Sequence, residues 1–389
     1  MKIRSLLLTL AAIAAASPAF AADTIRVGHL NTFTGPFGVL GIEMKRGLEL
    51  AQQHLGNKLG GVPMEIYETD EQSKPDIAVQ AATKMIDKDK VHIITGLLNS
   101  AITMAVTKPA IDAGVTVISA NSGPSVYAGE GCNANFFATA FQNDAFDEAA
   151  GEYMNKVGIK KLFLAGADYQ AGYDHLNGAK RTYKGAVVRE IFTPNSQLDF
   201  SAEMAQIRSD KPDALFTFYP GALGAAFIKQ WAQAGLNKTT RLFTGIYAAD
   251  ELTFKALGDS AIGMEVVGNW YPALDNPENK KFVAAFKEKF GRNPTMMSAG
   301  MYDAMMLMDA AVKQVGGKVE DRPAFTKALH KADYKSIKGA FKFNVNNYPI
   351  QNYQMSKVVK GADGNLTYEK LGELKDHKDS YYEKCKLTW

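Results

Sequence analysis

The sequence predicts an α/β protein made of two Rossmann-like lobes, each built around a parallel β-sheet. Short β-branched runs alternate with longer amphipathic segments along the chain, which is typical of βαβ crossovers and parallel sheets. The alternation begins a second time near Asp144, so two α/β units of similar size follow one another. A length of 389 residues also suits two domains.

The first unit covers the chain up to about residue 139. Met44, Leu48, Ala51 and Leu55 recur at near-helical spacing, and such a stripe indicates one helix face turned to a core. Gly114 follows the third helix, as expected of a residue that ends one. We expect strands over residues 25–30, 62–68, 91–95 and 115–119, and helices over 43–55, 76–88 and 101–113.

The second unit repeats the pattern, and later helices complete an existing lobe. We expect helices over 145–157 and 223–234, strands over 161–165, 214–218 and 241–244, and further helices over 280–290, 298–315 and 322–331. The extended stretches 136–141, 266–270 and 341–350 are candidates for crossings between lobes. The expected bounds are 22–139 plus 270–343 for lobe 1 and 140–269 plus 344–389 for lobe 2.

The first residues have the parts of a secretory signal peptide. Lys2 and Arg4 precede an apolar run over residues 6–16, and Ala19 and Ala21 supply the small residues of a cleavage site. The run is too short for a membrane anchor, which needs about 20 apolar residues. We therefore expect residues 1–21 to be removed, a mature chain starting at Ala22, and a location outside the cytoplasm.

Charge and cysteine content narrow the class of protein. The 44 basic and 41 acidic residues nearly balance, which argues against nucleic acid or an anionic membrane as a partner. The two cysteines, Cys132 and Cys385, are expected to pair in an oxidising compartment, with two buried free thiols as the alternative. No His or Cys spacing typical of a metal site occurs, and no cofactor is expected.

Sequence signatures of common enzymes are missing. The chain contains no phosphate-binding loop, no dinucleotide-binding glycine motif after the first strand and no G-x-S-x-G elbow. Gly258-Asp259-Ser260 follows a helix rather than a strand, so it is a poor candidate nucleophile site. No nucleophile, base and orienting acid can be combined. The sequence therefore favours binding over catalysis.

Polar loops follow three predicted strands. Asn99 and Ser100 follow the third, Asn121 and Ser122 the fourth, and the loop 32–37 the first. Ligands of doubly wound sheets bind at these strand ends, where helix N-termini present free N–H groups. Hydroxyl and N–H groups there suit a carboxylate. The alternative is that the serines only cap helices and turns.

With these loops, the mature chain resembles the type I periplasmic solute-binding proteins of ABC transporters, in the Leu/Ile/Val-binding family. The resemblance rests on short fragments in matching order: 25–28 with 34–36, Gly96 with Ser100, 118–120 with Pro124, 198–201, 211–213 and 231–236. It implies two lobes joined by a three-strand hinge that close on a solute. It also implies delivery to an ABC permease in the inner membrane, and we expect a monomer.

In that family, Ser100, Ala120 and Ser122 match positions that hold the ligand carboxylate. Ala171 stands where the family has a tyrosine, and the acid expected after residue 244 is missing, with Asp250 only later. An ammonium group buried without that acid would be costly. The residues expected around the ligand are Phe37, Asn99, Ser100, Ala120, Asn121, Ser122, Tyr169, Tyr219 and Tyr247.

Aromatic side chains in this set suit a flat ring. The sequence thus predicts a receptor for an aromatic or similarly apolar carboxylate, like the family members that bind aromatic carboxylates. Branched-chain amino acids are the alternative ligands, with Asp250 then supplying the acid. A solute-sensing partner of a membrane receptor is an alternative role, and an extracellular hydrolase is disfavoured.

Overall fold

The computed structural model describes residues 24–389. The expected signal peptide over residues 1–21 and its cleavage before Ala22 lie outside the described residues. Within residues 24–389, no helix is long and apolar enough to cross a membrane.

The first sheet has six strands in the order β2-β3-β1-β4-β5-β6. All neighbours in it are parallel except β2 and β3. Its strands and their helices are β1 (Ile25–Asn31), α1 (Gly38–His54), β2 (Lys58–Leu59), β3 (Val62–Asp70), α2 (Pro75–Asp87), β4 (Ile93–Gly96), α3 (Ser100–Asp112), β5 (Thr116–Ser119) and β6 (Phe136–Ala138).

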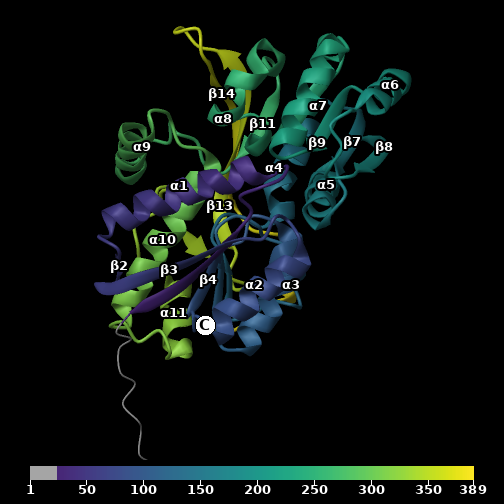
Figure 1. The fold of residues 1–389 in the computed structure, drawn as a ribbon. Coiled ribbons are helices and arrows are strands. Elements are labelled where there is room, and N and C mark those ends of the chain that lie inside the picture. Colours follow the sequence, from purple (N-terminus) through teal and green to yellow (C-terminus); the bar gives the residue numbers. More distant parts are fainter. Residues whose placement is uncertain (1–23) are drawn as a thin grey trace, which may run out of the picture.

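The second sheet has a parallel centre, β11-β10-β9-β7-β8, and an antiparallel edge made by the last strands. Its elements are α4 (Asn143–Lys156), β7 (Lys161–Ala167), α5 (Gln170–Thr182), β8 (Ala186–Thr193), α6 (Ser201–Asp210), β9 (Ala214–Phe218), α7 (Ala222–Gln233), β10 (Arg241–Gly245), α8 (Glu251–Leu257), β11 (Glu265–Gly268), β12 (Lys342–Phe343), β13 (Pro349–Lys360) and β14 (Leu366–His377). The two-lobed α/β fold is confirmed (Figure 1).

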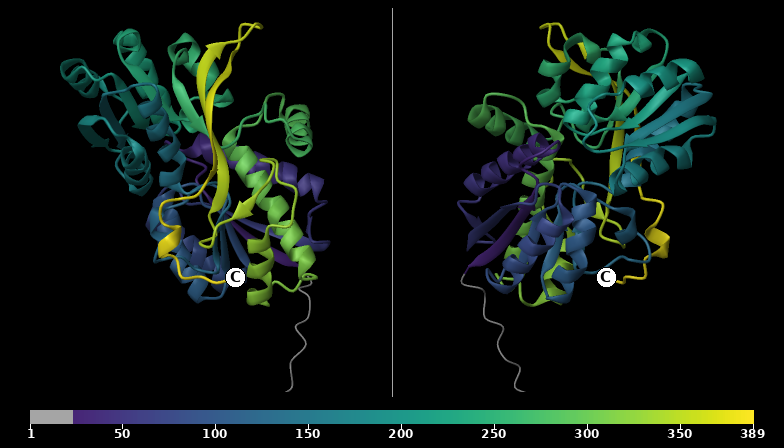
Figure 2. Two further views of the ribbon diagram at one scale, coloured as in Figure 1. Left: turned by 180° about the vertical axis from the view of Figure 1, so that it is seen from behind. Right: turned by 45° about the vertical axis from the view of Figure 1, so that its right-hand side comes forward.

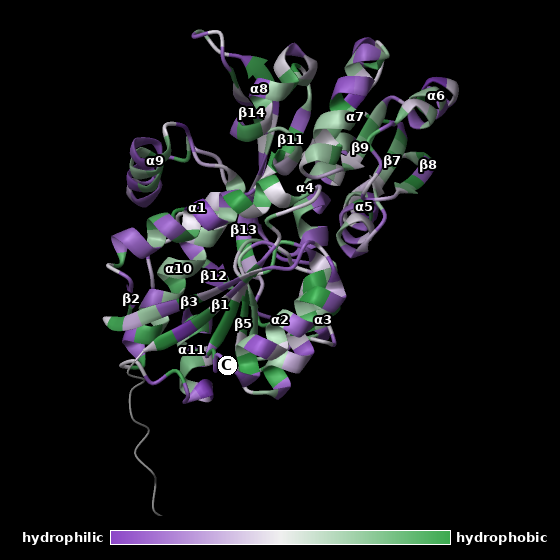
Figure 3. Ribbon diagram, viewed as in Figure 1, coloured by the Kyte–Doolittle hydropathy of each residue, from purple (hydrophilic) through white to green (hydrophobic). Residues whose placement is uncertain are grey.

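Three late helices return to the first lobe. They are α9 (Pro277–Phe290), α10 (Met296–Gln314) and α11 (Arg322–Lys331), and α10 packs along α1. Figure 3 shows mostly hydrophobic strands at the centre of this lobe, while the outlying α9 is mostly hydrophilic. Burial of the strands between helix layers follows from this pattern.

Helix α1 begins five residues before its expected start, because its first turns contain glycines that weaken the sequence signal for a helix. A Cβ at Gly41 would lie 1.6 Å from the Thr32 carbonyl oxygen, and one at Gly47 would lie 2.1 Å from that of Ser298. Glycine at these positions lets α1 approach the loop after β1 and the helix α10 closely.

The three connections between the lobes meet at one point. Asn269 donates a hydrogen bond to the Ala140 carbonyl at 2.7 Å, and Gln351 donates to the same oxygen at 2.9 Å. Asn269 also donates to the Gln351 side chain at 3.2 Å. The Ala140 carbonyl follows β6, Asn269 follows β11 and Gln351 lies near the start of β13, so these hydrogen bonds join the three strands of the hinge.

The C-terminal segment runs through both lobes (Figure 2). The long hairpin of β13 and β14 extends along the second lobe, and the tail then returns to the first. The predicted disulfide between Cys132 and Cys385 is present, and Trp389 stacks on His330 at 4.1 Å. The segment 344–389, expected wholly in lobe 2, thus ends on the first lobe because the disulfide holds its tail there.

Candidate ligand-binding site

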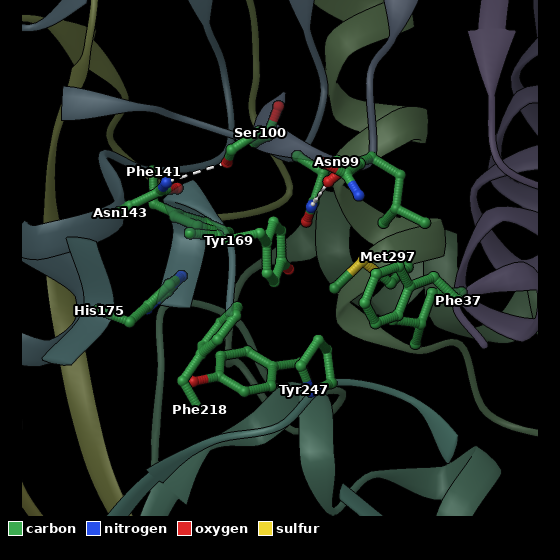
Figure 4. A pocket seen from close by; sticks show the side chains of 16 residues that line it. Phe37, Asn99, Ser100, Phe141, Asn143, Tyr169, His175, Phe218, Tyr247 and Met297 are labelled. Carbon is green, nitrogen blue, oxygen red and sulfur yellow. Dashed lines mark hydrogen bonds between the residues drawn. The ribbon is translucent and has the colours of Figure 1, made fainter. Parts of the chain in front are cut away.

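A cavity lies between the lobes, at the carboxyl ends of strands from both sheets (Figure 4). Its empty space is about 420 Å³ when the part open to solvent is counted, and the centre of a water molecule can reach about 30 Å³ of it. Its walls are formed by Phe37, Leu40, Leu98, Asn99, Ser100, Asn121, Ser122, Phe141, Asn143, Tyr169, Ala171, His175, Phe218, Pro220, Tyr247 and Met297. No acidic or basic side chain other than His175 belongs to this set.

The first-lobe wall is the N-terminus of α3. Asn99 caps the helix by accepting a hydrogen bond from the Ala101 N–H at 2.8 Å. The N–H groups of Ser100 and Ile102 find no acceptor among the described residues. The Ser100 hydroxyl accepts from Asn143 at 3.1 Å, and its own proton has no acceptor among residues 24–389. Free donors at a helix N-terminus make this wall suitable for an anion.

Asn121 and Ser122 also reach the cavity, but their polar groups are already engaged. The Asn121 amide donates to the Leu98 carbonyl at 2.9 Å, and the Ser122 hydroxyl donates to that of Leu97 at 2.8 Å. Ser122 is also hydrogen-bonded to Thr103. These bonds brace the loop after β5 against the loop after β4, so Ser100 is the freer donor.

The opposite wall is aromatic. Tyr169 lies between Phe37 of the first lobe and Phe218 of the second, with ring centroids 5.8 and 6.0 Å away. Phe218 contacts Tyr247 edge-on at 5.0 Å. Because a ring inserted here would meet several aromatic faces and edges, the wall favours a flat apolar ligand.

A histidine completes the second-lobe wall. His175 stacks on Phe218, with centroids 3.9 Å apart and an interplanar angle of 14°, and its Nδ1 is hydrogen-bonded to Asp147 on α4. Burial lowers the pKa of His175 to about 3 and raises that of Asp147 well above its ordinary value. Each direction favours the uncharged form of its side chain.

A polar chain links the two lobes beside the cavity. Asn143 donates to Ser100 at 3.1 Å and to Asp174 at 3.0 Å. Asp174, on α5, also accepts from the Ser125 N–H at 3.1 Å and the Ser125 hydroxyl at 2.7 Å. Because Ser125 belongs to the first lobe, this chain holds the lobes together next to the anion-binding wall.

Most of the expected residues meet at the cavity, and two do not. Phe37, Asn99, Ser100, Asn121, Ser122, Tyr169 and Tyr247 line it. Tyr219 is wrongly placed in that set: it packs between Phe200 and Phe227 in the second-lobe core, and its hydroxyl accepts from Thr193. Ala120 is buried behind the wall, facing Gly300.

Asp250 does not line the cavity either. Its carboxylate caps α8, accepting from the N–H groups of Leu252 and Thr253 at 3.0 and 3.3 Å.

Sequence reasoning missed Phe141, Asn143, His175, Phe218 and Met297 as cavity residues. His175 could have been found from its spacing: it follows Ala171 by four residues, and residues so spaced share a helix face. That inference required α5, which had not been assigned. Within residues 24–389, no cluster of three or more His, Cys, Asp or Glu side chains could hold a metal.

Two α/β lobes that enclose a cavity between them, with a three-strand hinge at one side, define a solute-binding protein. Residues 24–364 match the family described as periplasmic binding protein, and the chain belongs to that family.

Known proteins similar to this chain include receptors with bound aromatic acids. A solute-binding protein of an ABC transporter from R. palustris, in complex with benzoate, is 32% identical with a TM-score of 0.88, over 94% of this chain and 100% of that one. Another from R. palustris, in complex with 4-hydroxybenzoate, is 28% identical with a TM-score of 0.86, over 92% and 99%. Leu/Ile/Val-binding protein homolog 6 of Brucella melitensis is 27% identical over 383 residues, 94% of this chain and 97% of that protein.

Proposed function

We propose that this protein captures an aromatic or similarly apolar carboxylate between its closing lobes and delivers it to an ABC permease in the inner membrane. One observation carries the ligand class: the cavity joins a helix N-terminus with free donors to an aromatic wall, and no acidic side chain lines it. The donors suit a carboxylate, and the rings suit the body of the ligand.

The lack of an acid argues against an amino acid ligand. A bound amino acid would bury its ammonium group, and an ammonium without a counter-charge or full hydrogen bonding is costly. Asp250 is the nearest candidate by sequence, yet its Oδ1 caps α8 and the residue does not line the cavity. Branched-chain amino acids stay the alternative because relatives carry Leu/Ile/Val-binding names.

Similar structures support the same ligand class. The benzoate and 4-hydroxybenzoate complexes both cover more than nine-tenths of this chain. By analogy we propose a monomer that binds rather than converts its solute, is exported with loss of residues 1–21, and works in the periplasm. For the lobes we propose the sequence-based bounds, with residues 344–348 and the tail after β14 added to lobe 1, because Asn347 and Tyr348 donate to the first-lobe carbonyls of Phe136 and Pro124. A sensing role would show itself in the absence of adjacent permease and ATPase genes.

A thermal-shift screen with benzoates, cinnamates and branched-chain amino acids tests the ligand class. A ligand at 100 times its Kd should raise the free energy of unfolding by about 2.7 kcal/mol. Small-angle scattering at saturation should then show a smaller radius of gyration, because a ligand that contacts both lobes favours the closed state. Stabilisation by leucine or valine, with no response to any aromatic acid, would contradict the proposal.

A further inference from the structure

The second lobe presents a buried histidine–aspartate pair to the cavity. His175 on α5 and Asp147 on α4 are 2% and 0% exposed, and the His175 Nδ1 is hydrogen-bonded to the Asp147 Oδ2. The other carboxyl oxygen, Oδ1, has no hydrogen-bond partner within residues 24–389. Among the described residues, nothing hydrogen-bonds the His175 Nε2, and the imidazole belongs to the cavity wall.

Local packing fixes the direction of this imidazole. Ala171 lies four residues earlier on the same face of α5 and also lines the cavity. Its methyl group is small, so the imidazole one turn later has room to reach the cavity. Stacking on Phe218 and edge contacts with Phe141 and Phe146 hold the ring. Figure 4 shows the ring tip, with a nitrogen, directed toward the side of the cavity where Asn143 lies.

The charge of the pair decides whether the His175 Nε2 carries a proton and can donate a hydrogen bond. A buried pair with net negative charge would be costly, the more so beside Asp174 and Asp144, whose charges act on His175. Burying an oxygen without a hydrogen-bond partner also costs more when it belongs to a carboxylate than when it belongs to a neutral carboxyl group. Both arguments favour a pair without net charge, and such a pair holds two protons. One lies between Oδ2 and Nδ1, so the other is on Nε2, whichever of the first two atoms the shared proton is closer to.

We propose that Asp147 and His175 act together in ligand binding, with the His175 Nε2–H as the second-lobe hydrogen-bond donor to the ligand carboxylate. Ser100 and the N-terminus of α3 contact the carboxylate from the first lobe, so the ligand bridges the lobes through one polar group. Asp147 is then a positioning residue, because it acts only through the imidazole. This inference rests on the proposed function, since it assumes a carboxylate ligand.

The test measures benzoate affinity by calorimetry in matched variants. His175→Phe keeps a ring that can stack on Phe218 but removes the donor, and we expect benzoate affinity to fall about 10- to 100-fold, the value of a hydrogen bond to a charged group. His175→Gln keeps an N–H donor and should recover most of the loss. Tyr219→Phe, outside the cavity, is the control and should bind as wild type. Binding by His175→Phe within about twofold of wild type would overturn the proposal.

A second measurement does not depend on binding. Nitrogen-15 NMR of the imidazole in wild-type protein at neutral pH should show the proton on Nε2, whether or not benzoate is present. An unprotonated Nε2 would overturn the proposal even if His175→Phe loses affinity. If wild-type protein binds no aromatic acid at all, the proposed function fails, while the NMR result still decides the state of the pair.

Discussion

The two walls of the cavity are built on different principles. The polar part of the first-lobe wall consists of backbone N–H groups and small polar side chains at the start of α3 and in the loop after β5, fixed by hydrogen bonds to neighbouring loops. Apolar side chains of the same lobe lie beside it: Phe37, Leu40, Leu98 and Met297. The second-lobe wall consists of large side chains that hold one another, with one buried ionisable pair behind them. The first wall supplies most of the donors for a carboxylate and the second most of the aromatic surface for a ring, so neither lobe alone satisfies an aromatic carboxylate. This division explains how binding can favour closure of the lobes.

Replacing the free donor of the first wall should have the largest effect on affinity. Ser100→Ala removes a hydroxyl proton that has no other described acceptor, and we expect a loss of about 1.5–3 kcal/mol in benzoate binding, roughly tenfold or more. Calorimetry measures the change.

Ser122→Ala is the matched control for Ser100→Ala. The Ser122 hydroxyl already donates to the Leu97 carbonyl, so its loss should lower the free energy of unfolding by about 1 kcal/mol and change affinity little. Equal losses of affinity in both variants would mean that Ser122 turns toward the ligand, and that the first wall rearranges on binding.

Weakening the aromatic wall should have a smaller and more selective effect. Tyr169→Leu removes the ring between Phe37 and Phe218, and aromatic pairs contribute about 0.5–1.5 kcal/mol beyond area burial. Benzoate affinity should therefore fall up to about tenfold. Cyclohexanecarboxylate, which lacks a π-face, should lose less.

Tyr173→Leu serves as control for Tyr169→Leu, because Tyr173 is 38% exposed on the outer face of α5. It should leave both affinities unchanged. If Tyr169→Leu weakens the two ligands equally, the second wall recognises bulk rather than aromatic character.

The same contrast explains how far the sequence predicts the site. Residues of the first wall follow strands directly, so Asn99, Ser100, Asn121 and Ser122 could be placed from strand ends alone. On the second wall, Tyr219 and Phe218 are neighbours in sequence, and only Phe218 faces the cavity. Side chains alternate along an extended segment, so an error of one residue exchanges the cavity face for the core.

The fold was more predictable than the second wall because periodicity is a strong local signal. The alternation of strands and helices gave both sheets, and α11 has the expected bounds. By contrast, α5, α6 and β8 went unassigned. Helix α5 contains two glycines, and β8 is largely exposed, so neither has the apolar pattern that marks an element in sequence. His175 was missed together with the helix that carries it.

Removing a hydrogen bond that joins the lobes away from both walls should lower benzoate affinity only modestly. Ser125→Ala removes the hydroxyl that donates to Asp174 across the lobes. Asp174 keeps its donors from the Ser125 N–H, Asn143 and Gln170, so we expect a loss of only about threefold in benzoate affinity. Small-angle scattering of the ligand-free variant should show a slightly larger radius of gyration than wild type. An unchanged affinity would mean that this contact does not contribute to closure.

The smallest effect on affinity is expected for Asp250→Asn, and this variant is useful because it tests the ligand class. Asp250→Asn keeps a good helix cap and should leave benzoate binding unchanged, whereas an amino acid receptor that used this acid would lose its ligand.

Burial raises the pKa of Asp250 to about 7, from an ordinary value of 3.8. Between these values the folded state binds more protons than the unfolded state, so Asp250 makes wild-type stability fall as pH rises. The variant lacks that contribution, and denaturant titrations should show its stability relative to wild type increasing from pH 4 to pH 7.5. A constant difference across that range, or a loss of benzoate affinity, would place the Asp250 carboxylate in contact with solvent or ligand and weaken the contrast between the two walls.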